Sequence, residues 1–421
     1  MMKIVVVGGG SAAWITASYL HENLDCDLTV IHDDKDAIIG VGESTTPAIR
    51  KVITNLPDWK NKAKAIPKYG IRFRHWYEKE HEWYHLFEDA IIKDDGVDSI
   101  DFLRKNQPKI DTTAFNYYHG NYIDKCKNNL LDAKNDAIPG YGYHVQADKL
   151  GLALKEQMRD YTEIKSKVVD VKLNDDGIEY LLLNDGRKII ADYFFDCTGF
   201  KRVLISKLTV WQSYTDMIGD RYISGPVERK GKIQPYTMSN AYKNGWRWEI
   251  DTQDKRNAGY VYCSHLMSDG KAIQESGLNY EPLSFDSGRM KHVAIKNCIS
   301  NGLAQSFIEP LEATSIMLTC STVEKFVEIT KRKLRIETFN KWVCRFINWN
   351  KEFVRYHYVL SQRRDSEWWE YWGSLPNHIE DFLQSALKQK RYCGRNDTVV
   401  NHYNIAALMV ANKCFDPALI K

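Results

Sequence analysis

The chain has 421 residues, 43% of them hydrophobic and 27% charged, which is typical of a globular protein with a sizeable core. Its 58 basic and 55 acidic residues leave a formal net charge of only +3, which argues against a broad charged surface for nucleic acid or membrane. No apolar run reaches the length of a membrane span, and the chain exceeds the usual size of one domain. We therefore expect two lobes or one large elaborated domain.

Nine cysteines are scattered along the chain, and they include no Cys-x-x-Cys pair. Their odd number and their spacing argue against a disulfide framework and against a zinc site, so no metal is expected. The first residues enter an apolar strand pattern directly, without the layout of a signal peptide. These features predict a cytoplasmic protein in a reducing compartment.

The chain begins with the pattern of a β-α-β unit. Ile4–Val7 is a short apolar run of the kind found in buried parallel strands. Ala12–Leu20 has the pattern of a helix, and Leu28–Ile31 has the pattern of the next strand. This order predicts the start of a nucleotide-binding fold.

A glycine-rich turn joins the first predicted strand to the helix. Gly8 and Gly10 permit a tight turn and let the backbone approach a pyrophosphate at a helix N-terminus. The small side chain of Ala13 lets the helix pack closely on the strand. We predict dinucleotide binding at Gly8, Gly10, Ser11, Ala12 and Ala13. The fingerprint occurs once, so the sequence indicates no separate NAD(P)H site.

The middle of the chain changes from helix to sheet. Ala147–Tyr161 has helical character, because Leu150, Leu154 and Met158 recur on one face. Three strands separated by hairpin turn signals follow it, at Val168–Leu173, Glu179–Leu183 and Lys188–Phe195.

The second half of the chain is first strand-like and then helical. The aromatic block Tyr236–Tyr262 alternates strongly, which predicts sheet. From about Cys320 to about Lys390 the pattern is helical and rich in tryptophan. No linker of low complexity marks a domain boundary.

Four segments, in this order along the chain, resemble the flavin-dependent halogenases, the group that includes the tryptophan halogenases. They are the glycine turn, residues 66–73 (IPKYGIRF), residues 245–250 (GWRWEI) and residues 307–316 (FIEPLEATSI). The resemblance covers most of residues 3–320 and, more faintly, residues 354–376.

The resemblance implies an α/β fold: an FAD-binding Rossmann-like domain of the flavin monooxygenase type, with a β-meander and a substrate sheet, plus a helical C-terminal region. We expect the FAD-binding halogenase core at residues 1–320, with substrate-side segments interleaved at roughly 50–140 and 205–290. Residues 321–421 form the expected helical region that completes the substrate pocket.

The chemistry of the family implies two catalytic residues. FADH2, O2 and a halide ion give hypohalous acid, which a protein group must hold and direct at the substrate. Lys68 matches the family's catalytic lysine, whose amine donates a hydrogen bond to the hypohalous acid or becomes a haloamine. Burial assists this role by disfavouring the ammonium form, although most lysines lie solvated on surfaces. Glu312 matches a carboxylate that polarises the oxidant or removes the proton from the arenium intermediate.

The family's halide site matches Thr314 and Ser315, where backbone amides at a turn into a helix form an anion-binding nest. The alternative is an ordinary helix start with Pro310 and Glu312 in its first turn. Both interpretations are open from the sequence.

Trp246 and Trp248 match the family's tryptophans that lie near the flavin and keep the organic substrate away from it. The alternative is a pair of aromatic residues alternating on a half-buried strand. Here Asp251 stands where the family's signature has proline.

Two segments resemble the family's FAD contacts. Gly40, Val41, Gly42, Glu43 and Ser44 resemble its strap against the flavin, and the alternative is a glycine loop that caps a helix around residues 48–52. At the end of the second strand, His32 stands where the family has the ribose-binding glutamate, so the neighbouring Asp33 is the predicted substitute. A third departure is Ala313, where the family commonly has serine.

The resemblance also implies partners. A single dinucleotide fingerprint implies a separate flavin reductase that supplies FADH2. The well-known tryptophan halogenases are longer in the substrate lobe, so the shorter lobe here implies a more open pocket. We expect an aromatic small-molecule substrate range broader than free tryptophan: a phenol, an indole or a larger electron-rich arene. Chloride, bromide and iodide are all open as the halide, and so is homo-oligomerisation. Candidate aromatic residues of the pocket wall are Trp368, Trp369, Tyr371 and Trp372.

Two other functions stay open at this point. A flavin-dependent aromatic monooxygenase would share the glycine turn and the Asp-Cys-Thr-Gly segment at 196–199, but it has no need for Lys68 or the Trp-x-Trp motif. A catalytically silent flavoprotein that binds or senses redox state is the other, and the presence of Lys68 and Glu312 argues against it.

Overall fold

The computed structural model describes residues 1–33, 43–53, 57–87, 141–382, 384–385, 405, 408–409 and 412. The chain divides into two compact units, each assembled from three stretches of sequence. The first unit consists of residues 1–65, 145–217 and 286–348, and the second consists of residues 66–144, 218–285 and 349–421. The predicted boundary at residue 320 falls within a helix of the first unit and stays a prediction.

A six-stranded sheet organises the first unit, in the order β20-β21-β12-β1-β2-β8. Neighbouring strands from β21 to β8 run parallel, and β20 is antiparallel to β21. The bounds are β1 (Met2–Val7), β2 (Cys26–His32), β8 (Thr162–Lys165), β12 (Tyr193–Asp196), β20 (Ala294–Ile295) and β21 (Cys298–Ser300). The apolar run of β1 is buried, as the sequence predicts for a parallel strand.

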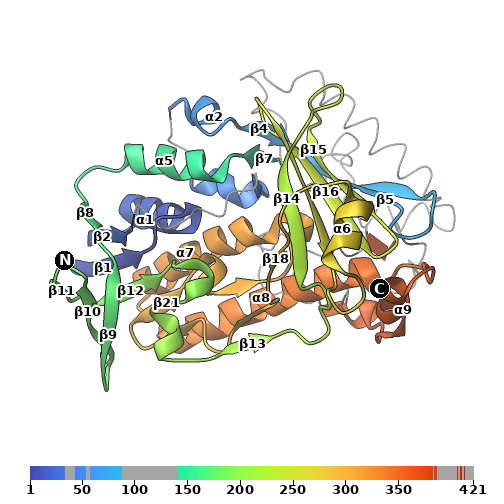
Figure 1. Cartoon of the computed structure of the whole chain (residues 1–421). Coiled ribbons are helices and arrows are strands. Elements are labelled where there is room, and N and C mark those ends of the chain that lie inside the picture. Colours follow the sequence, from blue (N-terminus) through green and yellow to red (C-terminus); the bar gives the residue numbers. More distant parts are fainter. Residues whose placement is uncertain are drawn as a thin grey trace, which may run out of the picture. The chain divides into compact units, whose positions relative to one another are not determined.

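Helix α1 (Ser11–Asn23) connects β1 to β2 and packs against α5 (Ala147–Gln157) and α7 (Thr314–Lys331). Figure 1 shows α1 and α5 side by side. Gly151 makes this contact close, because a Cβ there would lie 3.0 Å from Cδ1 of Trp14. The shorter elements nearby are β3 (Glu43–Ser44), the 3-10 turn η1 (Pro47–Lys51) and α2 (Trp59–Lys62). These elements confirm the predicted α/β fold.

The predicted meander is present, but its third strand is split. Strands β9 (Val168–Asn174), β10 (Gly177–Leu183) and β11 (Lys188–Ile189) form an antiparallel sheet. The chain then leaves this sheet and passes Asp192, whose carboxylate accepts a hydrogen bond from the backbone amide of Lys3 (2.7 Å). The residues that follow form β12 beside β1. A small sheet of β13 (Trp211–Ser213), β19 (Gly288–Met290) and β22 (Ser306–Phe307) completes the unit.

The second unit contains a seven-stranded sheet in the order β18-β14-β17-β16-β15-β5-β6. Only β15 and β5 are parallel neighbours in it. The bounds are β5 (Gly70–Arg74), β6 (Glu82–Leu86), β14 (Arg221–Val227), β15 (Tyr236–Ala241), β16 (Gly245–Asp251), β17 (Arg256–Tyr262) and β18 (Leu283–Ser284). The predicted sheet at 236–262 is thereby confirmed as β15, β16 and β17.

A separate strand pair carries Lys68. In it, β4 (Ile66–Lys68) runs antiparallel to β7 (Gly142–Val145). Helices of this unit include α6 (Asp269–Ser276) and α9 (Glu367–Ser374), and α8 (Ile336–Val359) runs along the chain from the first unit into the second.

A cluster of aromatic rings forms much of the core of the second unit. The ring centroid of Trp76 lies 5.0 Å from that of Tyr358, 5.8 Å from that of Trp246 and 5.9 Å from that of Trp369. Tyr358 stacks on Trp372 at 4.2 Å. Thus Trp368, Trp369 and Trp372, candidates for a pocket wall, are fully buried and pack against rings of the same unit.

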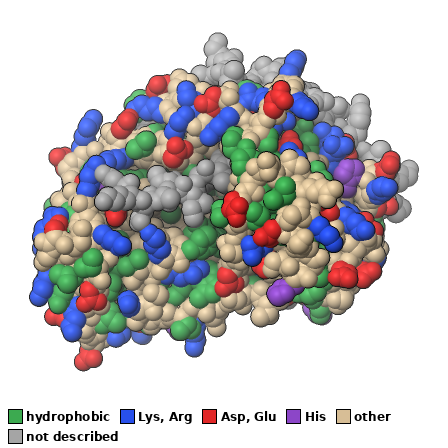
Figure 2. All heavy atoms as spheres, viewed as in Figure 1, with side chains coloured by type: hydrophobic (Ala, Val, Ile, Leu, Met, Phe, Trp, Pro, Cys, Tyr) green, Lys and Arg blue, Asp and Glu red, His purple; other side chains and the backbone are tan. Residues whose placement is uncertain are grey.

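Basic and acidic side chains are interspersed on the face that Figure 2 draws, in keeping with the net charge of +3. Among the helices that the structure describes, none has both the length and the apolarity to cross a bilayer. Six cysteines of the described residues carry free thiols: Cys26, Cys197, Cys263, Cys298, Cys320 and Cys344.

Gly259 offers a test of the packing around β16. A Cβ at this position would lie 1.9 Å from Cζ2 of Trp248, so we expect Gly259→Ala to lower the free energy of unfolding by about 1–3 kcal/mol. Gly270 is the matched control, since a Cβ there meets no atom within 4 Å. Urea denaturation of both variants checks this, and equal stabilities would contradict the packing described.

Candidate active site

Gly8 is the point of closest backbone approach in the glycine turn. Its φ of 140° is a conformation that L side chains rarely adopt, and a Cβ there would lie 2.3 Å from the carbonyl oxygen of Cys197. The Gly8 amide donates to the carbonyl of Ile31 (2.8 Å), which ties the turn to the end of β2. Only glycine meets these two conditions.

Helix α1 begins directly after this turn. Gly10 is its extended N-cap, and a Cβ there would meet no atom within 4 Å. The first amides of a helix have no intrahelical acceptor, so Ser11 and Ala12 offer donors to an anion in this open space. Ala13 is fully buried, as close packing of helix on strand requires. The bare backbone of this turn therefore fits the pyrophosphate of a dinucleotide such as FAD.

Asp196 braces the turn from the other side. Its buried carboxylate accepts hydrogen bonds from the backbone amides of Thr198 (3.0 Å), Leu204 and Ile205 (both 2.8 Å). Burial raises the pKa of Asp196 above its ordinary value despite these bonds. The Asp-Cys-Thr-Gly segment thus has a structural role in holding the backbone that touches Gly8.

At the end of β2, His32 stands where the family has glutamate, and its ring contacts a carboxylate. Nε2 of His32 is 2.8 Å from Oε1 of Glu163, and the His32 ring packs edge-on against Trp14. Burial alone would raise the pKa of Glu163, but hydrogen bonds from Lys155 and His32 lower it overall. The imidazole is therefore directed onto Glu163, a partner that sequence reasoning missed. Asp33, partly exposed at the next position, stays the candidate for the ribose.

The predicted flavin strap is described only in part. Gly40, Val41 and Gly42 lie outside the described residues, and Glu43 and Ser44 form β3. The turn η1 follows, with Thr46 as its N-cap but without a side-chain capping bond. The Thr46 hydroxyl is buried and has no hydrogen-bond partner among the described residues. The capping alternative is therefore wrong for this side chain.

The Glu-Pro-Leu-Glu segment adopts an unusual backbone. Glu312 (φ 66°) and Ala313 (φ 56°) are consecutive non-glycine residues in the left-handed region, and α7 starts only at Thr314. The alternative of an ordinary helix start with Glu312 in its first turn is therefore wrong. Such conformations are held at a cost and concentrate at functional sites.

The same backbone is suited to an anion. Changes between right-handed and left-handed residues turn successive amides toward one point, and here that point lies at the N-terminus of an 18-residue helix. Thr314 is buried and Ser315 is partly exposed. The Glu312 side chain is 5% exposed. The segment therefore brings together a buried carboxylate and amides that suit a halide.

Lys68 ends β4 in the second unit. Its side chain is fully buried, which is rare for lysine. Its Nζ lies 4.6 Å from the centroid of the Phe87 ring, a cation–π distance. In the strand pair, Lys68 lies opposite Gly142. The residue that the sequence singled out is therefore an interior amine.

His144 lies on the strand beside Lys68. Its Nδ1 is 3.0 Å from the carbonyl oxygen of Asp251, and its Nε2 is 3.0 Å from Oγ1 of Thr237. Burial, followed by the positive charge of Lys68, lowers the pKa of His144 to about 3. The imidazole is thus neutral at ordinary pH. Sequence reasoning missed it, because the pairing of residues 66–68 with 142–144 leaves no local signal.

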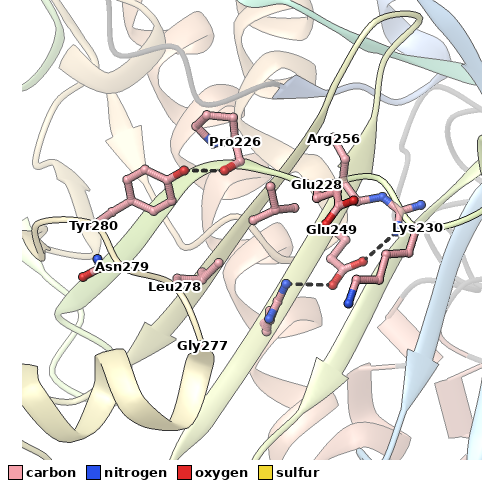
Figure 3. Close-up of a pocket in the computed structure, with 11 residues that line it drawn as sticks. Pro226, Glu228, Lys230, Glu249, Arg256, Gly277, Leu278, Asn279 and Tyr280 are labelled. Carbon is pink, nitrogen blue, oxygen red and sulfur yellow. Dashed lines mark hydrogen bonds and ion pairs between the residues drawn. The ribbon is translucent and has the colours of Figure 1, made fainter.

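Trp246 and Trp248 point to one face of β16, and Arg247 and Glu249 point to the other. Both tryptophans are buried, and the indole nitrogen of Trp246 has no hydrogen-bond partner among the described residues. On the opposite face lies a hollow of about 600 Å³. Figure 3 shows Glu249 and Arg256 in its wall, joined by an ion pair of 3.2 Å. Glu249 also pairs with Arg247 (3.0 Å), so its single carboxylate is shared by two arginines.

Comparison with known proteins places the chain among flavin enzymes. The sequence profile of the family described as tryptophan halogenase matches residues 3–418. The chain belongs to the tryptophan halogenase family. It is a flavin-dependent halogenase, and the expectation drawn from the four motifs is confirmed.

Curated relatives cover most of this halogenase. Tryptophan 7-halogenase KtzQ of Kutzneria sp. (strain 744) is 26% identical over 423 residues, which cover 89% of this chain and 79% of the relative. Tryptophan 6-halogenase SttH of Streptomyces toxytricini is 27% identical over 424 residues, which cover 87% of this chain and 80% of the relative.

Solved structures confirm the fold. A tryptophan halogenase from Shewanella frigidimarina NCIMB 400 superposes with a TM-score of 0.84 at 23% identity, covering 98% of this halogenase and 89% of that chain. The flavin-dependent halogenase BrvH from Brevundimonas sp. BAL3 superposes with a TM-score of 0.81 at 22% identity, covering 100% and 92%.

The left-handed backbone of Glu312 and Ala313 gives a prediction about stability. Because glycine adopts this conformation without cost, we expect Ala313→Gly to keep or raise the free energy of unfolding, and Ala313→Val to lower it by about 1–2 kcal/mol. The control is Ala153→Gly inside α5, which should lose about 1 kcal/mol. Urea denaturation measures all three. A loss on Ala313→Gly equal to that of the control would contradict the left-handed assignment.

His144 gives a pH prediction. Its folded-state pKa of about 3 lies below the ordinary value of 6.5, so the unfolded chain binds more protons between these values. The contribution of the neutral His144 ring to the free energy of unfolding is therefore full above pH 6.5. It falls by up to about 1.4 kcal/mol for each pH unit as the pH drops toward 3. The difference in unfolding free energy between the unchanged chain and His144→Asn, measured across this range, should show that slope. A difference that does not change with pH would mean that folding does not lower the pKa of His144.

Proposed function

We propose that this chain relays hypohalous acid to Lys68 for electrophilic halogenation of an electron-rich arene, with a substrate range broader than free tryptophan. FAD, delivered as FADH2 by a separate reductase, would give two electrons to O2 and the halide would give two more, so that with one proton one oxygen atom leaves as water and the other bonds the halogen as hypohalous acid. The observation that carries the proposal is the complete burial of the Lys68 side chain. A surface lysine could not keep the oxidant from solvent.

The environment of Lys68 supports the role of an amine that handles an electrophile. Burial disfavours the ammonium form of any lysine, so a neutral nucleophile is more accessible than in water. His144 adds no charge at ordinary pH. The amine either donates a hydrogen bond to hypohalous acid or attacks its halogen, which releases water and leaves a haloamine. Transfer of the halogen to the arene then restores the amine.

Glu312 has the complementary task. An arene that has gained a halogen must lose a proton to recover aromaticity, and a buried carboxylate is a suitable base. The Glu312 side chain is 5% exposed and is held by a strained backbone, which limits its freedom. The amides at Thr314 and Ser315 are the proposed halide donors. Trp246 and Trp248 are the proposed barrier between flavin and arene.

The proposed FAD contacts are the residues whose motifs resemble those of the family. The glycine turn with Ser11, Ala12 and Ala13 would hold the pyrophosphate, and Asp33 the ribose. Glu43 and Ser44, with Gly40, Val41 and Gly42, would form the strap. The helix N-terminus and the bare backbone at Gly8 and Gly10 support the first of these contacts.

Mass spectrometry of an arene panel tests the proposal. Phenols, indoles and free tryptophan are incubated with the protein, FAD, a flavin reductase, NADH, O2 and chloride, bromide or iodide. We expect halide-dependent mass shifts on several arenes and a loss of product by about 100-fold or more in Lys68→Ala. Lys232→Ala, at an exposed lysine of the same unit, is the matched control and should keep the unchanged rate.

Other outcomes separate the competing functions. A gain of one oxygen in place of halogen would show a monooxygenase. Full activity in Lys68→Ala would remove the relay from the mechanism. Strict preference for free tryptophan would refute the broader substrate range.

A further inference from the structure

The pairing of β4 with β7 sets Lys68 and His144 on one face of the strand pair. Ile66 lies opposite His144, and Lys68 lies opposite Gly142. Since side chains alternate along a strand, the side chains of Lys68 and His144 point to the same side. They are diagonal neighbours, a relation in which long side chains reach one another. The lowering of the His144 pKa by the charge of Lys68 agrees with this proximity.

The two hydrogen bonds of His144 define its tautomer. A carbonyl oxygen can only accept, so Nδ1 carries the proton that the Asp251 carbonyl receives at 3.0 Å. In the neutral ring Nε2 is then an acceptor, and the Thr237 hydroxyl donates to it at 3.0 Å. The ring has no exposed surface. Its orientation is therefore fixed at both ends.

Asp251 is itself held firmly. Nε and Nη2 of Arg256 donate to its two carboxylate oxygens, both at 2.8 Å, and Nε of Arg229 donates at 3.1 Å. The backbone amide of Gln234 adds a bond of 2.9 Å. Burial alone would raise the pKa of Asp251, but the bonds from Arg256 and Gln234 and the charges of the two arginines lower it overall. The residue is an anchored anion, and its carbonyl is a fixed point.

This anchor exists because the chain has aspartate at position 251. A proline there would still present a carbonyl, but it would offer no carboxylate to Arg256 and Arg229. Arg256 is also fixed on the other side by Glu249, in the wall of the hollow (Figure 3). The line of contacts thus runs from Glu249 through Arg256 and Asp251 to His144.

We propose that His144, held as the neutral Nδ1–H tautomer between Asp251 and Thr237, is a positioning residue that sets the strand pair and the direction of the Lys68 amine. This inference rests on the proposed function of Lys68. In the absence of the ring, the amine loses a rigid neighbour and delivers the halogen less accurately. Formation of hypohalous acid is unaffected, because His144 takes no part in it.

The test measures how much of the hypobromous acid reaches the arene and how much escapes into solution. The full chain with FAD, reductase, bromide and an arene that it halogenates is assayed for two products: the brominated arene, and hypobromous acid captured by a soluble scavenger. We expect His144→Phe to lower the fraction delivered to the arene by about 10- to 100-fold, with total oxidant unchanged. His144→Asn, which keeps a donor for the Asp251 carbonyl, should give an intermediate value.

His357→Phe is the matched control. His357 is also buried in the second unit, 2% exposed, with its Nδ1 2.9 Å from the carbonyl of Phe353. The same substitution there should cost stability without changing the division of oxidant. Assays are run at a temperature at which circular dichroism shows all variants folded.

Nitrogen NMR of the histidine-labelled chain provides a second readout that needs no activity. We expect the His144 signal to show the Nδ1–H neutral form across about pH 5 to 8. A protonated ring, the opposite tautomer, or a division of oxidant in His144→Phe equal to that of His357→Phe would overturn the inference. Failure of the proposed function is distinct: the unchanged chain would then form no brominated arene, or Lys68→Ala would form as much.

Discussion

Burial of the Lys68 amine sets the requirements for the residues around it. An ion removed from water loses several kcal/mol of hydration that nearby groups must offset. Here the Phe87 ring lies 4.6 Å from the amine, and the imidazole beside it is neutral. A network of full charges centres on Asp251, whose carboxylate is matched by two arginines. The carbonyl of Asp251 fixes the imidazole that lies on the strand beside Lys68.

In the first unit, two backbone segments suit the binding of anions. At Gly8 the absence of a Cβ lets the turn touch Cys197, and the amides at the start of α1 stay accessible. At Glu312 and Ala313 the left-handed backbone turns amides toward the N-terminus of α7. Both places suit anions, a pyrophosphate in one case and a halide in the other. A halogenase that uses FAD needs both kinds of site, one for the pyrophosphate of the cofactor and one for the halide.

The sequence predicted what depends on local pattern. Apolar runs identified β1 and β2, and the motifs identified Lys68 and Glu312 as residues of interest. It missed what depends on pairing across distance: His144 beside Lys68, Glu163 on His32, and the separation of β11 from β12 at Asp192, which bonds the amide of Lys3. The role of Asp251 was also hidden. Its departure from the family's proline was visible, but the arginines that use its carboxylate come from two other places in the chain.

The most direct test of the central claim is the fate of the oxidant in Lys68→Met, which replaces the amine by an apolar group of similar length. Oxygen consumption, brominated arene and bromine trapped by a soluble scavenger are measured together. The relay predicts unchanged oxygen consumption, almost no brominated arene, and a matching rise in trapped bromine. Bromination of the arene at the unchanged rate would show that the oxidant reaches it without Lys68 and would contradict the mechanism.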